Sequence, residues 1–363
     1  MIPEENFTQM IARLDRETGE ESRAWLRENR APGPFRGFFR GVRRFASVYR
    51  SERGSRAGVR GLFFAVNEGM RPFLSAAKCW EAKLPARRIP MGDEPPRGAA
   101  APPAAGRETL AAVVMTKDCE DLVEGTLRSV AGWADEIVVI DGFSKDRTVE
   151  ICRKYTDKVF QNKWDGYRFC TERNLGNAKA SADWCFHVDP DERATPEFRR
   201  AVTRLLESKP GENAFEFRKK NFFLGRWMRH GGWFHYSRHL FRRGKATYDG
   251  VIHESLKVDG GVGKLEAPVE HYPFVSISQF VERHNGYSKR EALALKESHG
   301  SISERETLFN LKSKPVKRFF KFYFKKKGFL EGAHGLVFST LFAWVHFVNW
   351  AKYWELGAGD TRA

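Results

Sequence analysis

The chain has 363 residues, of which 41% are hydrophobic and 30% are charged, and it contains 30 phenylalanines. This composition excludes a wholly disordered chain, a small disulfide-stapled scaffold and a polytopic membrane protein. The formal net charge of +16 favours an anionic partner, which is nucleic acid, an acidic membrane face or a phosphorylated substrate.

The first fifteen residues contain Glu4, Glu5 and Asp15 and no apolar core of signal-peptide length. Five cysteines are present, and no two have the two-residue spacing of a zinc knuckle or redox pair. We therefore expect a cytosolic protein with reduced cysteines that only pack.

A basic, helix-prone arm is predicted over residues 1–93, and part of it recurs near the C-terminus. Residues 57–81 align with residues 331–355 at a shift of 274, with nine identities in twenty-five positions. A shift longer by seven residues, which is two helical turns, also aligns Pro34, Phe38 and Phe39 with Pro315, Phe319 and Phe320. The interpretation is two copies of one helical module, and the alternative is convergent amphipathic composition.

Residues 94–107 are the predicted linker, because Glu94 to Gly106 holds four prolines and five alanines, which sustain neither a helix interior nor a sheet ladder. Residues 108–310 form the predicted core domain, in which short apolar runs alternate with segments of helical periodicity. The runs are 110–115, 136–141, 158–161 and 183–189, and the helical segments are 120–132, 147–155 and 168–180. This alternation predicts an α/β fold with a mostly parallel, Rossmann-like sheet flanked by helices.

Carboxylates follow the carboxyl ends of these strands, where ligands bind in parallel sheets. Asp118, Asp141, Asp189 and Asp191 occupy such positions, and no glycine loop follows the first strand. A dinucleotide-binding or P-loop site is therefore not expected. The Asp189–Asp191 pair is either a solvated loop or a site for Mg²⁺ or Mn²⁺ on a diphosphate, since these cations prefer oxygen ligands.

Seven segments resemble the inverting family 2 glycosyltransferases of the GT-A fold, particularly lipopolysaccharide core glucosyltransferases. They are WADEIVVIDGFSKDRTVEI, WDGYRFCTERN, DWCFHVDPDE, YDGVIHE and the closing KPVKRFF, GFLEGAHG and AKYWEL, so the resemblance covers about residues 110–356.

The resemblance implies roles for individual residues. Thr116 and Asp118 would border the base and ribose, Asp141 the uracil or ribose, and Asp189 the hydroxyls of sugar and ribose. Asp191, with Asp189, would ligate the metal, and Arg173 and Asn174 would contact the donor. The family usually has Asn–Glu where this chain has Asp118–Cys119, and its acceptor loop is GGWFHY here. Base selectivity and acceptor recognition are therefore not carried over.

Glycosyl transfer requires a general base for the acceptor hydroxyl, opposite the leaving diphosphate. The best candidate lies in DGVIHE, with Glu254 as base, His253 as helper and Asp249 as the second choice; the alternative is a buried polar pair that caps a strand. Arg238, Arg242 and Arg243 are candidates for a phosphate clamp or for a solvated face.

Residues 311–363 are predicted to be a membrane-associating helical module. Lys312 to Lys327 carries eight basic residues with five aromatic rings between them, which suits an anionic membrane interface; single-stranded nucleic acid is the competing partner. Residues 332–351 lack Asp, Glu, Lys and Arg and are long enough to cross a bilayer. Since the matching N-terminal copy carries Arg60, Glu68 and Arg71, we expect both to lie along the membrane or pack on the core.

The sequence thus predicts a metal-assisted, inverting hexosyltransferase with a UDP-linked donor and a lipid-linked or lipopolysaccharide-core acceptor. We expect it at the cytoplasmic face of the cell membrane as a peripheral protein without nucleic acid. The alternatives are a catalytically silent homologue that acts as a membrane scaffold, and a nucleic-acid binder that shares the sheet.

Overall fold

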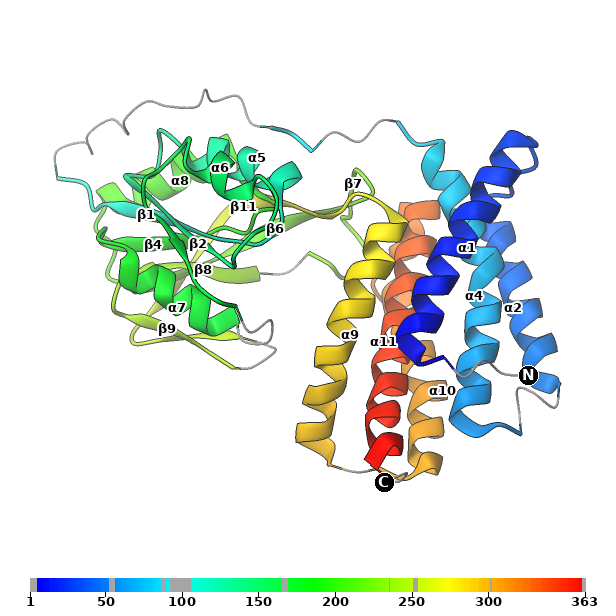
Figure 1. Cartoon of the computed structure of the whole chain (residues 1–363). Coiled ribbons are helices and arrows are strands. Elements are labelled where there is room, and N and C mark those ends of the chain that lie inside the picture. The colour runs from blue at the N-terminus through cyan, green and yellow to red at the C-terminus, as the bar shows by residue number, and fades with distance from the viewer. Residues whose placement is uncertain are drawn as a thin grey trace. The chain divides into compact units, whose positions relative to one another are not determined.

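The four apolar runs predicted as strands form the parallel part of one sheet in the computed structural model (Figure 1). β1 (Leu110–Thr116) lies between β2 (Glu136–Asp141) and β4 (Trp184–His187), and β2 pairs with β3 (Val159–Gln161), all in parallel. Both faces of β1 are buried, which explains why its sequence is continuously apolar.

The structure describes residues 5–51, 56–85, 89–91, 106–164, 169–234, 236–250, 254–300 and 302–360. Most of the predicted linker and His253 lie outside these residues. The chain forms two compact units. The sheet unit comprises Arg88–Phe222 and Phe234–Pro273, and the helical unit comprises Met1–Arg87, Phe223–Trp233 and Phe274–Ala363.

Antiparallel strands extend the sheet beyond β4, in the order β3-β2-β1-β4-β8-β6-β11-β5. They are β5 (Glu192–Ala194), β6 (Ala214–Phe223), β8 (Tyr236–Arg242) and β11 (Val262–Phe274), with the short β7 (Arg226–Trp227) beside β6. β9 (Ala246–Asp249) and β10 (Ser255–Val258) form a separate hairpin. The predicted α/β class is confirmed, and the sequence interpretation missed the antiparallel strands.

Helices cover both faces of the sheet (Figure 1). Apolar side chains of α5 (Glu120–Val130), α6 (Thr148–Cys152) and α8 (Pro196–Glu207) share one core with β1 and β2. α7 (Phe169–Lys179) and the β9–β10 hairpin contribute to a second core on the other face. The carboxyl ends of β1, β2 and β4 are therefore left as one edge between two covered faces.

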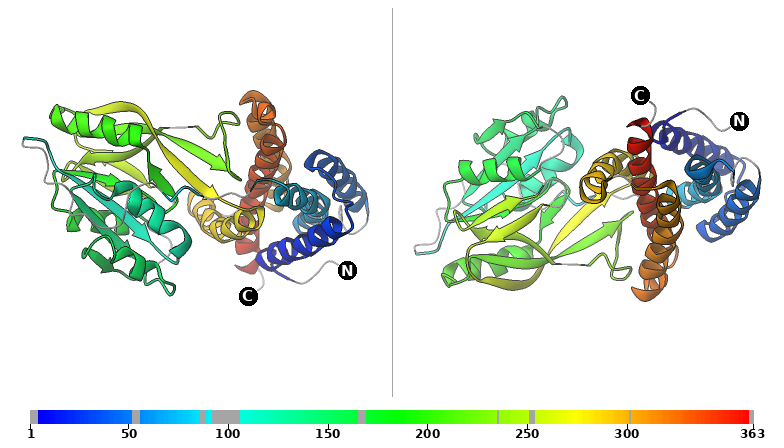
Figure 2. Two further views of the ribbon diagram at one scale, coloured as in Figure 1. Left: turned by 90° about the horizontal axis from the view of Figure 1, so that it is seen from above. Right: turned by 90° about the horizontal axis from the view of Figure 1, so that it is seen from below.

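The helical unit contains α1 (Phe7–Arg27), α2 (Pro34–Arg50), α4 (Gly58–Ala82), α9 (Ile277–His299), α10 (Glu304–Phe320) and α11 (Ala333–Asp360). A π-helical turn, η1 (Lys321–Lys325), and a 3₁₀ turn, η2 (Gly328–Glu331), join α10 to α11. α11, red in Figures 1 and 2, lies between α9 and the N-terminal helices.

The boundaries of the units differ from the predicted domains. α9 was expected in the core domain of residues 108–310, but Ile277, Phe280 and Val281 are buried in the core of the helical unit. The reason is the apolar face of α9, which becomes buried only when it packs against other helices. Residues 274–310 therefore belong with both ends of the chain.

The apolar run 332–351 is explained by burial inside this unit. Val337, Leu341 and Phe347 of α11 are almost fully buried in its core. Over the described residues, no helix has the combination of length and hydropathy that crossing a bilayer requires.

Contacts made by α4 and α11 are equivalent at positions related by the 274-residue shift. Lys78 Nζ donates to the backbone oxygen and Oδ1 of Asp15 on α1, and Lys352 Nζ donates to the same two atoms of Asn285 on α9. We propose that α1–α2–α4 and α9–α10–α11 are two copies of one three-helix module.

A second pair of contacts is exchanged between these copies. Glu81 of α4 accepts a hydrogen bond from the backbone N–H of Ile277 at the start of α9, at 3.1 Å. Glu355 of α11 accepts one from the backbone N–H of Phe7 at the start of α1, at 2.9 Å. Each carboxylate therefore satisfies an N–H group that the first turn of a helix leaves unpaired.

α2 packs closely on α4 through small residues. A Cβ atom at Gly41 would lie 2.4 Å from the backbone oxygen of Gly69, and one at Gly37 would lie 2.5 Å from the Cβ of Ala76. Only Pro34, Gly37 and Gly41 of α2 are buried, so these glycines determine how closely the two helices approach.

We expect Gly41→Ala to lower the free energy of unfolding by about 1–3 kcal/mol, because the new methyl group meets backbone rather than a side chain that can move. Urea unfolding followed by circular dichroism measures the change. Gly286→Ala on α9 is the control, since its Cβ meets nothing within 4 Å and should be neutral or stabilising. Equal stability of the two variants would contradict the proposed close packing.

Candidate functional site

Asp141, at the end of β2, is the centre of a buried hydrogen-bond network. Its carboxylate accepts hydrogen bonds from Thr116 Oγ1 at 3.0 Å, from the backbone N–H of Ser144 at 2.9 Å and from Gln161 Nε2 at 3.2 Å. Ser144 Oγ also donates to it, at 2.5 Å. The network fixes the turn after β2 against the ends of β1 and β3.

Asp118 joins the loop after β1 to the same turn. Its Oδ1 accepts from the backbone N–H of Lys145 at 2.7 Å, and its own N–H donates to Ser144 Oγ at 2.9 Å. The residue has φ +45°, an uncommon conformation for a non-glycine residue that clusters at functional sites. Thr116, Asp118 and Asp141 are therefore brought together, as their positions at strand ends predicted.

Arg173, on α7, forms the second part of the site. Its Nη2 donates to Asp189 Oδ1 at 3.1 Å, and its Nε donates to Glu254 Oε1 at 2.6 Å. The guanidinium also lies over the ring of Tyr248, 5.4 Å from the ring centre. One buried cation thus joins the ends of β4 and α7 to the segment that enters β10.

The pKa values in this group follow from the balance of burial and attraction. Burial alone would lower the pKa of Arg173 and raise that of Asp189. Their mutual attraction outweighs burial, so the pKa of Arg173 is raised and that of Asp189 is lowered. Both groups remain charged at neutral pH, and Asp189 keeps the negative charge that the predicted role requires.

Glu254 and Asp249 have different surroundings. Glu254 Oε2 is buried without a hydrogen-bond partner among the described residues, whereas its Oε1 is held by Arg173. The Asp249 side chain is 59% exposed and forms an ion pair with Lys257 across the β9–β10 hairpin. Of these two candidate bases, only Glu254 offers a positioned, desolvated oxygen.

The side chain of Asn174 forms hydrogen bonds within the sheet unit. Its Nδ2 donates to the backbone oxygen of Tyr248 and its Oδ1 accepts from the backbone N–H of the same residue, both at 2.9 Å. The amide therefore pairs like a strand residue and fixes α7 to β9, next to Arg173.

Two of the candidate clamp arginines, Arg242 and Arg243, are also engaged inside the sheet unit. Arg242 pairs with Glu108 and Arg243 Nε donates to the backbone oxygen of Ala182. Arg238, the third candidate, pairs with Glu216. Each of the three arginines therefore has a partner within the sheet unit.

A second buried ion pair was missed by the sequence interpretation. Lys219 on β6 pairs with Glu192 on β5, and Glu192 Oε2 accepts from the backbone N–H of Asp189 at 3.1 Å. Burial lowers the pKa of Lys219, but Glu192 and Asp189 outweigh it and raise the pKa. Phe215, Phe217 and Lys219 share the buried face of β6, so two-residue periodicity could have revealed an inward lysine.

The carboxylates after β4 provide a limited donor set for a metal. Asp189 is paired with Arg173, and Asp191 Oδ1 lies 3.6 Å from His271 Nε2. Over the residues that the structure describes, no three His, Cys, Asp or Glu side chains gather as a metal site. Mg²⁺ commonly uses one or two carboxylates and completes its shell with substrate phosphates and water, and the pair Asp189 and Asp191 fits that mode of binding.

Arg173→Met would leave two carboxylates without their partner, and we expect it to lower the free energy of unfolding by about 3–5 kcal/mol. The exposed Arg147, which pairs with Glu150, provides the matched variant Arg147→Met, for which we expect no measurable change. Chemical unfolding of both variants tests this. Similar losses in the two would mean that Arg173 does not hold the site together.

Several known proteins are similar in sequence to the part of the chain that contains this site. A family model described as glycosyl transferase family 2 matches residues 111–256. An uncharacterized glycosyltransferase of Rickettsia conorii is 26% identical over 261 residues, which cover 68% of this chain and 90% of the relative. The lipopolysaccharide core biosynthesis glycosyltransferase LpsC of Rhizobium meliloti is 25% identical over 231 residues, which cover 57% of this chain and 81% of LpsC.

Solved structures are similar to this chain at lower sequence identity. The S. aureus protein TarS (1–349), in complex with UDP-GlcNAc, is 14% identical with a TM-score of 0.38, and the match covers 69% of this chain and 92% of that one. Glucosyl-3-phosphoglycerate synthase from Mycobacterium tuberculosis, in complex with Mg²⁺ and UDP, is 15% identical with a TM-score of 0.34, covering 54% and 81%.

Proposed function

We propose, from the match of residues 111–256 to the glycosyl transferase family 2 model, that the chain transfers a hexose from a UDP-linked sugar. The transfer would proceed with inversion, to a lipid-linked or lipopolysaccharide-core saccharide. The observation that supports it most directly is the Arg173 group. One guanidinium there holds both a charged carboxylate, Asp189, and Glu254, whose Oε2 is buried without a hydrogen-bond partner among the described residues.

Glu254 is the proposed general base. The acceptor hydroxyl loses its proton to Oε2 as its oxygen forms a bond to the anomeric carbon, and the bond from that carbon to the diphosphate oxygen breaks. Arg173 holds Oε1, so the free oxygen keeps one orientation. Asp249 is a weaker candidate, because its exposed carboxylate is neutralised by Lys257.

The donor would lie along the carboxyl ends of β1, β2 and β4. Thr116, Asp118 and Asp141 would border the base and ribose, with Asp141 acting mainly by holding the turn. Arg173 would contact the donor while Asn174 fixes α7 beneath it, and Asp189 would meet hydroxyls of the sugar.

Asp191, with Asp189, would hold a divalent cation that arrives with the diphosphate. When bound, Mg²⁺ or Mn²⁺ supplies Lewis-acid stabilisation of the leaving phosphate. The two aspartates fit because they offer hard oxygen ligands after one strand.

The acceptor class is supported by the likeness to LpsC and by the positive charge of the chain. With a saccharide on a membrane lipid as acceptor, the proposed place of action is the cytoplasmic membrane surface, with the chain as a peripheral protein. His253, which lies outside the described residues, is the candidate helper of Glu254.

The proposal is tested by UDP release from a panel of UDP-hexoses, with lipid-linked saccharide and with Mg²⁺ or Mn²⁺. We expect Glu254→Gln to reduce kcat by at least about 100-fold without weakening donor binding, because general-base catalysis contributes about 100- to 10,000-fold. Asp191→Asn should weaken donor binding in the presence of the metal and not in its absence. Thermal shift with UDP measures binding.

Asp249→Asn is the matched control and should retain near wild-type turnover. An Asp249→Asn enzyme as inactive as Glu254→Gln would overturn the assignment of the base. Wild-type protein that neither binds nor turns over any donor would favour the silent membrane scaffold instead.

A further inference from the structure

α2 and α10 come from opposite ends of the chain and lie side by side in the helical unit. The rings of Phe38 and Phe319 stack with their centres 5.7 Å apart, and Lys312 Nζ lies 5.5 Å from the ring centre of Tyr49. Since Phe38 and Tyr49 run along α2 in the order opposite to their partners on α10, the two helices are antiparallel.

Exposed phenylalanines continue outward from this contact. Phe39 is 66% exposed, Phe320 is 56% exposed and Phe324 is 50% exposed. Ring contacts join them into one series, because Phe39 touches Phe38, Phe319 touches Phe320, and Phe320 stacks on Phe324 at 5.3 Å. Hydrophobic rings exposed together in this way mark a surface that contacts another apolar phase.

The same surface is strongly basic. α2 contains five arginines and residues 312–327 contain eight Lys or Arg, and neither segment contains Asp or Glu. Exposed members of this set without an ion pair to another described residue include Arg36, Arg40, Arg43, Lys317, Lys321 and Lys325.

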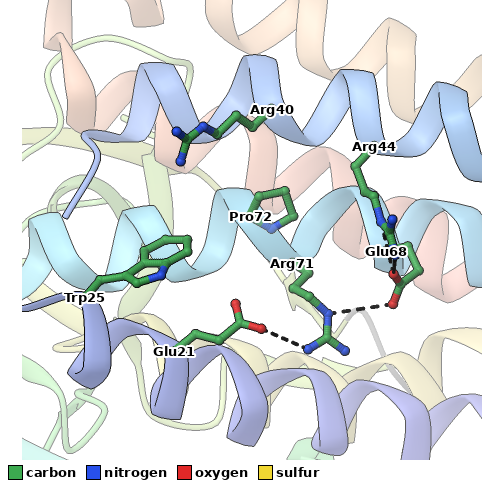
Figure 3. Close-up of a pocket in the computed structure, with 7 residues that line it drawn as sticks. All are labelled: Glu21, Trp25, Arg40, Arg44, Glu68, Arg71 and Pro72. Atoms are coloured by element: carbon green, nitrogen blue, oxygen red, sulfur yellow. Dashed lines mark hydrogen bonds and ion pairs between the residues drawn. The ribbon is translucent and has the colours of Figure 1, made fainter. Parts of the chain in front are cut away.

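Two other arginines of the helical unit, Arg44 and Arg71, form ion pairs. A cavity of about 490 Å³ is lined by residues of α1, α2 and α4, which Figure 3 draws as sticks. Arg44 pairs there with Glu68, and Arg71 pairs with Glu17 and Glu21, whereas Arg40 forms no ion pair with another described residue. Part of the positive charge of α2 is therefore neutralised by α4, and part is left without an ion pair among the described residues.

We propose that α2, α10 and η1 form one docking face for an anionic lipid bilayer. Phenylalanines of both helices would enter the headgroup region while the lysines and arginines contact lipid phosphates. The exposed rings are fixed against one another by their ring contacts, which is compatible with both helices lying in the plane of the membrane. This inference rests on the proposed function in one respect, which is that the acceptor is linked to a membrane lipid. Binding of the protein to vesicles can be measured without any acceptor.

Flotation of the full chain with vesicles of phosphatidylcholine, with and without 30% phosphatidylglycerol, tests the docking face. We expect binding to the anionic vesicles only. Arg36→Gln/Arg43→Gln should weaken it about 25-fold, since each cation contributes about fivefold. Phe39→Ser/Phe320→Ser should weaken vesicle binding, and the binding that is left should be abolished by high salt. The control Arg200→Gln/Arg204→Gln removes the same charge from α8 and should bind like wild type.

Equal binding by wild type and both face variants would overturn the proposal. Tighter binding of a single-stranded oligonucleotide than of anionic vesicles, lost in the same variants, would also overturn it and identify nucleic acid as the partner. Circular dichroism, and UDP release from a UDP-hexose in the presence of a water-soluble acceptor, are measured on each variant. Vesicle binding without any UDP release would support the docking face and contradict the proposed function. UDP release without vesicle binding would support the proposed function and contradict the docking face.

Discussion

The arrangement of the candidate site depends on one buried guanidinium. Arg173 satisfies Asp189 after β4 and Glu254 before β10, two carboxylates that are 65 positions apart in the chain. Without the cation, burial of both carboxylates in one place would be strongly unfavourable. With it, the β9–β10 hairpin is held to the carboxyl edge of the parallel strands, and Asn174 on the same helix adds backbone-like hydrogen bonds to β9.

The parallel strands and their edge could be predicted because local sequence determines them. LAAVVM and EIVVID are apolar on both faces, which indicates strands covered on both sides, and parallel pairing then brings Thr116, Asp141 and Asp189 to one edge. The network around Asp141 was partly foreseeable for the same reason, since Ser144 follows it in a tight turn.

Contacts between distant segments could not be predicted in this way. The pairing of Arg173 with Glu254 depends on where the β9–β10 hairpin packs, and the sequence of neither segment contains that information. The apolar run in α11 has the length of a membrane crossing, yet its neighbours α4 and α9 bury it. The length of a run without charged residues therefore does not by itself distinguish the centre of a helical bundle from a bilayer span.

The exchanged carboxylates of the helical unit have a structural consequence. Glu81 closes the first turn of α9, and Glu355 closes the first turn of α1, so neither three-helix copy is complete without the other. A fragment with only one of the two proposed copies would lose the partner of its carboxylate and the partner of its first helix. The covalent chain therefore keeps both partners together in one molecule.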